Sequence, residues 1–439
     1  MFIFQKKKYR FPKDPRASVA INHLGNNLKQ ETAVKPFQGV FSGFVDVPKG
    51  EIFYTVIEAR KNVEKAPVIV YLLGGPGAPS SPFLACGLGP YQIQKDEKKK
   101  ALVITDNPNT WAENATLILI DNPRGCGYSQ VTNGEYVTTA EEAAQDLQIA
   151  IPMILKQYSL EQLPLYIGGI SYGGTYVPFT AQALMNAGHA IAGLIIASGY
   201  TDPVLILNSY VESYIQRGFL FPNERALLSA YLSEFVKLVK DGNYEEAANY
   251  VDDTGKILTY IQSKTGIVNW LNLLTPFGND PKFTTIMNAV QFMTEGRNLF
   301  PIGESPFNAA SSSGIDWNVY DNLKVAMAKS AFTPLKELIQ KGVSMLLMGG
   351  EYDGMVPFDA TDALLQMLKK NKAIAELLKD PATSQLLKDE KGGILGYYRS
   401  SQMGSQIIFQ GIIRNSGHMV DVDQPIGTKE LVDLFLESV

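Results

Sequence analysis

The sequence predicts an α/β fold with a mainly parallel central sheet, helices on both faces and an inserted helical cap. Short, continuous apolar runs recur along the chain, as expected of strands that are covered on both faces. Each run ends in a glycine-rich loop, and helical segments separate the runs, which is typical of parallel sheets. A long stretch of helical periodicity without strand-like runs interrupts this alternation in the second half of the chain.

Composition bounds the possible functions. The 439 residues are 45% hydrophobic and 19% charged, which is enough to bury a large core and excludes wholesale disorder. A net charge of −5 gives no electrostatic reason to expect binding to nucleic acid or to an anionic membrane. No segment approaches the roughly 20 apolar residues of a membrane span. We therefore expect a globular protein, and the oligomeric state is left open.

The first 36 residues are polar and irregular, and we expect them to form an N-terminal extension. Their short apolar start precedes three lysines, which is the wrong order for a signal peptide. Only two cysteines occur, Cys86 and Cys126, and we expect both to be small buried apolar residues. These features favour a cytoplasmic location.

The first strands follow the extension. Residues 41–47 and 51–59 read as an antiparallel pair joined by a Pro-Lys-Gly turn. Residues 67–73 and Thr116–Ile120 are continuous apolar runs and therefore predict strands buried on both faces. Each of the two runs ends in a glycine-containing loop at the predicted carboxyl edge of the sheet, where ligands bind in folds of this class.

Helices and strands then alternate. Thr139 and Glu142 form the sequence pattern of a capping box, and the following helix is expected to kink at Pro152. Apolar strands are expected at 165–170, Gly193–Ala197, 343–348 and 407–414, and a closing helix at 429–437. The stretch from 204 to 330 has helical spacing throughout. We expect an α/β core at 37–203 and 331–439, with 204–330 as the cap that shapes substrate access.

A Gly-x-Ser-x-Gly motif lies at Gly169–Gly173, directly after a predicted strand and before a helical segment. This pattern predicts a nucleophile elbow, a sharp turn that exposes the hydroxyl of Ser171. On the motif alone, this segment could equally be a glycine-rich turn without a catalytic role. The backbone N–H of Tyr172 and that of Gly75, in the Gly-Gly-Pro-Gly loop after an earlier strand, are the expected oxyanion donors.

Two further residues complete a catalytic triad. Asp353 and His418 each follow a predicted core strand, and the chain order serine, aspartate, histidine is the order that this kind of fold uses. The serine hydroxyl needs a base because it is a weak nucleophile, and His418 would serve as that base. Asp353 would orient the imidazole. We expect neither a cofactor nor a metal.

With these motifs in place, the chain resembles the serine carboxypeptidases, which are peptidases of the α/β-hydrolase class. The resemblance runs from about residue 41 to 425 and includes Gly-Gly-Pro-Gly, Leu-Gly-Pro at 88–90, Ser-Tyr-Gly-Gly-Thr-Tyr at 171–176 and Gly-His-Met-Val at 417–420. It implies a secreted or lysosomal peptidase that removes C-terminal residues at acid pH, in contrast to the location suggested by the N-terminus and the cysteines.

The chain departs from the family where the substrate's terminal carboxylate would bind. The family places an asparagine where this chain has Leu73, before Gly74, and glutamates where it has Ile170 and Gly87. A carboxylate facing apolar groups would lose hydration without gaining partners. Arg124 lies in a loop at the same edge and could bind that carboxylate in bidentate fashion, or could stabilise its own loop.

The sequence therefore predicts a serine hydrolase that works through an acyl-enzyme. A divergent carboxypeptidase acting on a peptide is the first hypothesis. An acyl hydrolase or acyltransferase acting on a small ester is the alternative, because the Leu73 and Ile170 subsite is apolar. The Arg-Gly-Cys-Gly-Tyr-Ser segment also resembles proline iminopeptidases, and a catalytically silent binding protein stays possible.

Overall fold

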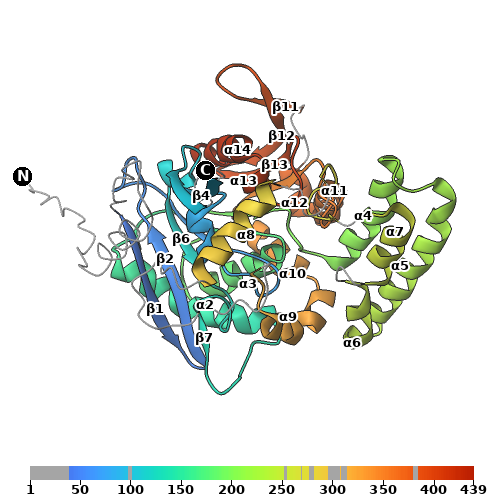
Figure 1. Cartoon of the computed structure of the whole chain (residues 1–439), viewed down its shortest axis with the longest axis horizontal. Coiled ribbons are helices and arrows are strands. Elements are labelled where there is room, and N and C mark those ends of the chain that lie inside the picture. The colour runs from blue at the N-terminus through green and yellow to red at the C-terminus, as the bar shows by residue number, and fades with distance from the viewer. Residues whose placement is uncertain are drawn as a thin grey trace, which may run out of the picture.

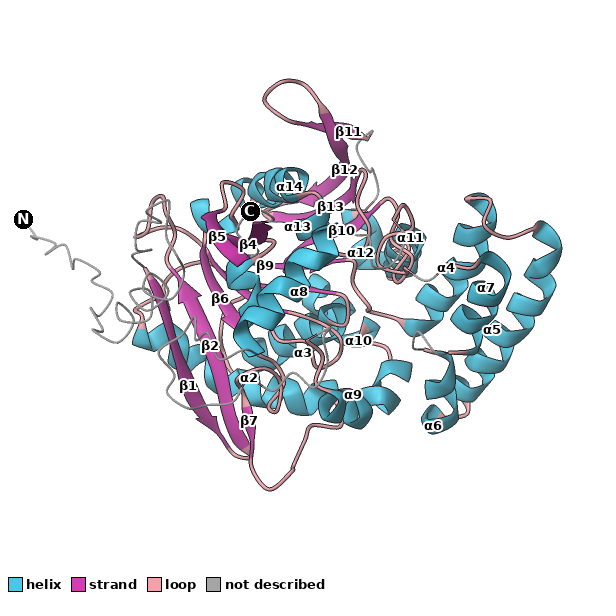
Figure 2. Ribbon diagram, viewed as in Figure 1, coloured by secondary structure: helices cyan, strands magenta, loops and turns pink. Residues whose placement is uncertain are grey.

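The computed structural model describes residues 39–96, 101–251, 255–267, 269–275, 281–294, 307, 314–378 and 384–439. The predicted N-terminal extension and the serine-rich loop at 311–313 lie outside the described residues. Figures 1 and 2 show a twisted sheet through the body of the molecule with helices on both sides of it.

Eleven strands of the described chain form one sheet, and two more form a separate hairpin. The strands of the sheet are β1 (Val40–Val47), β2 (Gly50–Ile57), β3 (Val68–Leu72), β6 (Thr116–Ile120), β7 (Gln130–Val131), β8 (Leu165–Ile170), β9 (Gly193–Ala197), β10 (Ser344–Gly350), β11 (Gln385–Lys388), β12 (Ile394–Met403) and β13 (Gln406–Ile413). Their order is β1-β2-β6-β3-β8-β9-β10-β13-β12-β11, with β7 beside β2. The six strands from β6 to β13 are parallel, and the strands flanking them are antiparallel. The predicted mainly parallel sheet is confirmed.

The helices of the described residues cover both faces. They are α2 (Ala140–Gln157), α3 (Gly173–Asn186), α4 (Pro203–Gln216), α5 (Arg225–Lys240), α6 (Tyr244–Ala247), α7 (Lys256–Thr265), α8 (Pro281–Thr294), α9 (Trp317–Leu323), α10 (Phe332–Gln340), α11 (Phe358–Leu368), α12 (Lys372–Leu377), α13 (Val420–Asp423) and α14 (Pro425–Ser438). Short 3₁₀ turns lie at Ser81–Ala85 (η1), Trp111–Glu113 (η2), Pro222–Glu224 (η3), Ala248–Tyr250 (η4) and Lys324–Ala328 (η5).

Two hydrophobic clusters lie on opposite faces of the sheet because successive strand side chains alternate. In β3, Val70 and Leu72 point into the cluster under α2 and α3, whereas Tyr71 points into the cluster under α14 and η1. All five residues of β3 and of β6 are buried. Since fully burying one such apolar side chain contributes roughly 1.5–3 kcal/mol, these central strands hold the two layers together.

The capping box at the start of α2 is only half as predicted. The Thr139 hydroxyl accepts a hydrogen bond from the Glu142 N–H at 3.2 Å, as expected of an N-cap. The Glu142 carboxylate, however, accepts from the Thr138 N–H at 2.8 Å rather than from that of Thr139. Pro152 lies inside the helix, which continues to Gln157.

The described residues between β9 and α10 form only helices and loops, in agreement with the helical periodicity of the sequence. Figure 1 shows α5, α6 and α7, in green, grouped at one end of the molecule. The exact cap boundaries, 204 and 330, stay a prediction. The hairpin of β4 (Tyr91–Asp96) and β5 (Ala101–Asp106) was not expected from the sequence, and neither were β11 and β12, because their mixed polar and apolar residues give no continuous apolar run.

Candidate active site

Ser171 lies at the sharp turn between β8 and α3, as predicted. Its φ of 60° is in the left-handed region that non-glycine residues rarely adopt, and such strain costs on the order of 1–3 kcal/mol. Three backbone hydrogen bonds hold the turn: Ser171 N–H donates to the Ala197 carbonyl at 3.2 Å, and its carbonyl accepts from Tyr200 at 2.7 Å and Gly174 at 2.8 Å. The hydroxyl is thus fixed at the carboxyl end of β8.

The two glycines of the motif are required by their distance to strand β3. A Cβ atom on Gly169 would lie 2.6 Å from the carbonyl oxygen of Leu72, and one on Gly173 would lie 2.5 Å from the same oxygen. Both spacings are shorter than van der Waals contact. The close approach of β8 and α3 to β3 therefore depends on glycine at both positions.

Asp353 and His418 meet directly. The His418 Nδ1 lies 2.9 Å from the Asp353 Oδ2, and both side chains are buried. The other carboxylate oxygen accepts from the N–H groups of Met355 at 2.8 Å and Val356 at 2.9 Å. Because an ionised carboxylate can only accept, Nδ1 carries the proton and Nε2 is left as the basic nitrogen.

The sheet brings the three residues to one edge. Strands β8, β9, β10 and β13 are consecutive and parallel, so the loops after β8, β10 and β13 that carry Ser171, Asp353 and His418 leave the same side of the sheet. No hydrogen bond joins the Ser171 hydroxyl to His418 Nε2 within the described residues. Such contacts are often long before substrate binds and tighten in the reacting complex.

Gly74, the neighbour of the expected oxyanion donor Gly75, lies against this turn. A Cβ on Gly74 would come within 2.7 Å of both the Ile170 carbonyl oxygen and the Ser171 Cβ, and closer still to the Tyr172 nitrogen. Gly75 has a φ of +102°, which suits glycine alone. Among the described residues, no hydrogen bond uses the backbone N–H of Gly75 or of Tyr172. In the described part of the chain both expected donors are therefore left without an internal acceptor, and their role as an oxyanion hole stays a prediction.

Leu73 and Ile170, the apolar residues that stand where the family has polar ones, lie together on the η1 side of the sheet. Leu73 and Ile170 belong to one buried cluster, with Leu73 8% exposed and Ile170 fully buried. Arg124 is 3% exposed, its Nε donates to the Glu135 carbonyl at 2.7 Å, and its Nη1 pairs with the Asp146 carboxylate on α2. These contacts favour the second role considered for Arg124, the stabilisation of its own loop.

One segment that holds the histidine loop was not predicted from the sequence. The backbone carbonyl of Leu271 accepts from the His418 N–H at 2.6 Å, and the Leu273 N–H donates to the Tyr352 carbonyl at 3.0 Å. The Asp423 carboxylate accepts from the Gly417 N–H at 2.6 Å and from the Asn272 side chain at 3.1 Å. Residues 269–275 precede α8 and carry no motif, so only the tertiary contacts identify them.

Cys86 and Cys126 are buried and unpaired, as expected. In the described part of the chain, no group of three or more metal-ligating side chains gathers in one place. No helix formed by the described residues is both long enough and apolar enough to cross a membrane.

Comparisons with known proteins agree with the resemblance noted in the sequence. A family model described as serine carboxypeptidase matches residues 31–438. The probable serine carboxypeptidase CPVL of Mus musculus is 25% identical over 428 residues, which cover 93% of this chain and 86% of that protein. The venom serine carboxypeptidase of Apis mellifera is 27% identical over 420 residues, which cover 91% and 84%. Among solved structures, the prohormone-processing carboxypeptidase Kex1 of Saccharomyces cerevisiae has a TM-score of 0.73 at 18% identity, with 91% of each chain covered. This last likeness confirms the α/β-hydrolase fold.

Proposed function

This chain belongs to the serine carboxypeptidase family, and we propose that it removes C-terminal residues from peptides through an acyl-enzyme formed on Ser171. Membership of the family makes it a serine carboxypeptidase-like hydrolase. The observation that carries the proposed mechanism is the 2.9 Å hydrogen bond between His418 and Asp353 at the sheet edge where β8 delivers Ser171.

In the proposed mechanism, His418 Nε2 takes the proton of the Ser171 hydroxyl as its oxygen attacks the scissile carbonyl carbon. The N–H groups of Gly75 and Tyr172 stabilise the resulting oxyanion. His418 then gives the proton to the leaving amine, and the acyl group stays on the serine as an ester. A water molecule, deprotonated by the same imidazole, attacks this ester, and the imidazolium returns the proton to the Ser171 oxygen as the bond between that oxygen and the acyl carbon breaks. Asp353 stabilises the imidazolium in both steps.

A second candidate, hydrolysis or transfer of an acyl group from an ester, rests on Leu73 and Ile170. Both side chains are apolar and buried in one cluster. A terminal carboxylate brought against them would lose hydration, at a cost of several kcal/mol if no donor replaced the water. An ester would carry no such charge. The peptidase is favoured because the family model matches residues 31–438.

The deciding experiment compares three substrates that share one N-blocked acyl residue: a dipeptide with a free C-terminus, its C-terminal amide and the matching ester. Rates are measured from acid to neutral pH, with Ser171→Ala as the blank. The proposal expects a preference for the free acid and no turnover or fluorophosphonate labelling in the blank. Cleavage of ester or amide without the acid would favour the second candidate, and activity in Ser171→Ala would refute the mechanism.

A matched pair of substitutions examines the carboxylate subsite. In the double variant Leu73→Asn with Ile170→Glu, polar groups return to the two positions where the family carries them. We expect the ratio of free-acid to amide cleavage to rise, because the terminal carboxylate regains hydrogen-bond partners. An unchanged ratio in a folded variant would show that these residues do not line the subsite.

A further inference from the structure

The Asp353 carboxylate is held by two backbone N–H groups, and the direction of each N–H depends on its peptide plane. Met355 and Val356 both donate to Oδ1, which leaves Oδ2 for His418. Each N–H shares a rigid plane with the carbonyl of the preceding residue, which is Gly354 for the first and Met355 for the second. Whatever holds these two carbonyls therefore also aims the two N–H groups.

Two tyrosines of α4 donate to those same two carbonyls. The Tyr214 hydroxyl donates to the Gly354 carbonyl at 3.0 Å, and the Tyr210 hydroxyl donates to the Met355 carbonyl at 2.7 Å. Each peptide group thus accepts a hydrogen bond from a tyrosine and donates one to Asp353. The two chains of hydrogen bonds end on one carboxylate oxygen, Oδ1.

Helical spacing places both tyrosines on one face of α4. Residues four apart in a helix lie one turn apart on the same side, and Tyr210 and Tyr214 are 3% and 1% exposed. Arg217, which caps the helix, donates to the Glu351 carbonyl at 3.2 Å. The last two turns of α4 are therefore docked on the loop that carries Asp353.

The approach of α4 to this loop is close. A Cβ atom on Gly354 would lie 2.8 Å from the Tyr214 hydroxyl oxygen and 2.8 Å from the Trp270 carbonyl oxygen, so glycine is needed there. Burial, followed by the neighbouring Tyr210 and Asp353, raises the pKa of Tyr214 well above its ordinary value. The Tyr214 hydroxyl therefore stays protonated and remains a donor at acid and at neutral pH.

We propose that Tyr210 and Tyr214 are positioning residues for the triad, each acting on Asp353 through one peptide group. A hydrogen bond accepted at a peptide carbonyl polarises the peptide and strengthens the bond that its N–H donates. Together the two chains hold the carboxylate so that Oδ2 faces His418 Nδ1 at 2.9 Å. The proposal rests on the acyl-enzyme mechanism proposed above, but not on the nature of the acyl group or of the leaving group.

Replacing either tyrosine by phenylalanine removes the hydroxyl and keeps the ring. We expect Tyr210→Phe and Tyr214→Phe each to lower the rate of Ser171 acylation about tenfold, and the double variant to lower it about 10²-fold. These losses lie below the roughly 10⁴-fold loss expected when the aspartate function itself is removed. In steady state kcat should fall with little change in KM, because both hydroxyls are bonded to backbone carbonyls.

The experiment measures how fast a fluorophosphonate labels Ser171 in the full chain, which reports acylation without a peptide substrate. The tyrosine substitutions are compared in the wild-type background and in Asp353→Ala. In Asp353→Ala they should leave the remaining rate unchanged, because the carboxylate on which they act is missing. A purely structural role would instead lower the rate by the same factor in both backgrounds.

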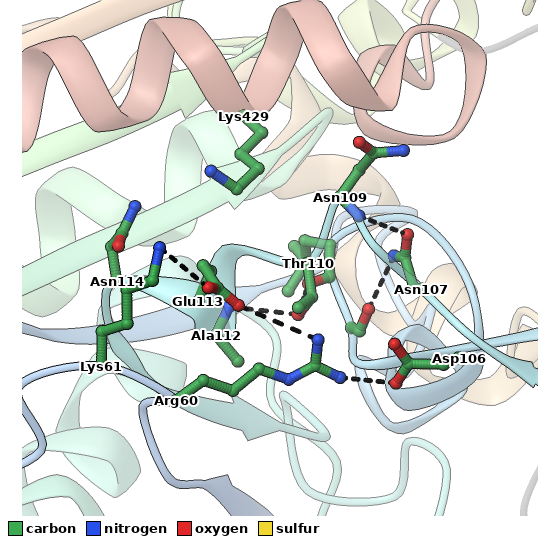
Figure 3. A network of polar contacts seen from close by, with 12 residues as sticks. Arg60, Lys61, Asp106, Asn107, Asn109, Thr110, Ala112, Glu113, Asn114 and Lys429 are labelled. Carbon is green, nitrogen blue, oxygen red and sulfur yellow. Dashed lines mark hydrogen bonds and ion pairs between the residues drawn. The ribbon is translucent and has the colours of Figure 1, made fainter. Parts of the chain in front are cut away.

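Two control variants remove a buried hydroxyl elsewhere. The Tyr54 hydroxyl, on β2 and five strands from β10, donates to the Gln157 side chain at 3.1 Å. The Thr110 hydroxyl donates to the Leu88 carbonyl at 2.9 Å, and Figure 3 shows Thr110 in the polar network near Glu113. Tyr54→Phe and Thr110→Val should both keep the wild-type labelling rate, and thermal unfolding identifies the variants that are folded.

Nuclear magnetic resonance follows each peptide group without turnover. In protein labelled with ¹⁵N at methionine and valine, the Met355 amide proton should shift upfield in Tyr214→Phe, and the Val356 amide proton in Tyr210→Phe. Equal shifts of both amides in either variant would contradict two separate chains. These shifts decide the matter if Asp353→Ala is labelled too slowly to measure.

The outcomes separate this inference from the proposed mechanism. Unchanged labelling in both tyrosine variants, or an equal fold-loss in the wild-type and Asp353→Ala backgrounds, overturns the role of the tyrosines and leaves the acyl-enzyme mechanism intact. A wild-type protein that is not labelled at Ser171 overturns the mechanism and this proposal together.

Discussion

Replacing Asp421, which lies on α13 and is 1% exposed, by asparagine should reduce the loss of folding stability that the protein undergoes as the pH rises to neutrality. Neither of its carboxylate oxygens has a side-chain or backbone partner within hydrogen-bond distance in the described chain. Burial raises the pKa of Asp421 to about 7 in the native state, from an ordinary value of 3.8. Between about pH 4 and pH 7 the unfolded chain has lost this proton while the native state still holds it. The group's stabilising contribution is therefore complete at pH values below about 4 and is lost as the pH rises through about 7.

The magnitude follows from the pKa difference. About three pH units at 1.36 kcal/mol each give a loss of about 4 kcal/mol in the wild type by pH 8. An entropy of unfolding of about 2.1 cal/mol/K per residue over 439 residues converts this loss into a Tm shift of about 4 °C. Asparagine does not ionise at any of these pH values, so the unfolding free energy of the Asp421→Asn variant should not fall in this way.

Urea unfolding or calorimetry of both proteins at pH 4, 5, 6, 7 and 8 measures the effect. The difference in unfolding free energy, variant minus wild type, should increase with pH and level off above about pH 7. Any constant offset reflects packing of the amide and cancels from the slope. A difference that is flat across this range would refute the premise that Asp421 is buried without a partner for its charge.

Three further predictions concern the candidate active site. Asp353→Asn should lower kcat by about 10⁴-fold without unfolding the protein, because the amide can donate to His418 and so favours the wrong tautomer; a loss below tenfold would contradict the assigned pair. Asp423→Ala should lower kcat by about 10²-fold with little change in KM, since the Gly417 N–H loses its acceptor and the histidine loop shifts. Asp423→Asn should keep much of the kcat that Asp423→Ala loses. Equal kcat values in the two variants would count against a positioning role. Gly74→Ala should lower kcat by 10²-fold or more, because its Cβ would overlap the oxyanion donors near Tyr172. Gly188→Ala, whose Cβ meets nothing within 4 Å but whose φ is +92°, is the control for backbone strain away from the site: it should lower stability and leave kcat unchanged.

The local pattern was sufficient to predict the central strands and the turn that carries Ser171. Continuous apolar runs can be accommodated only where both faces are covered, so β3, β6, β8, β9 and β10 were expected close to their observed bounds. The elbow was predictable because the short distance from Gly169 and Gly173 to the Leu72 carbonyl permits only glycine. Strands β11 and β12, at one end of the sheet, were missed because their residues are only partly buried.

Sequence alone determined the class of chemistry, because Ser171, Asp353 and His418 each follow a predicted core strand, and the carboxyl ends of parallel strands meet at one edge of the sheet. Only the tertiary structure decided which other groups lie near them. Arg124 is paired with Asp146, Asn272 holds the histidine loop from far along the chain, and Asp421 occupies the space beside Gly87. These contacts join segments with no sequence pattern in common, since they depend on how loops from different strands pack together.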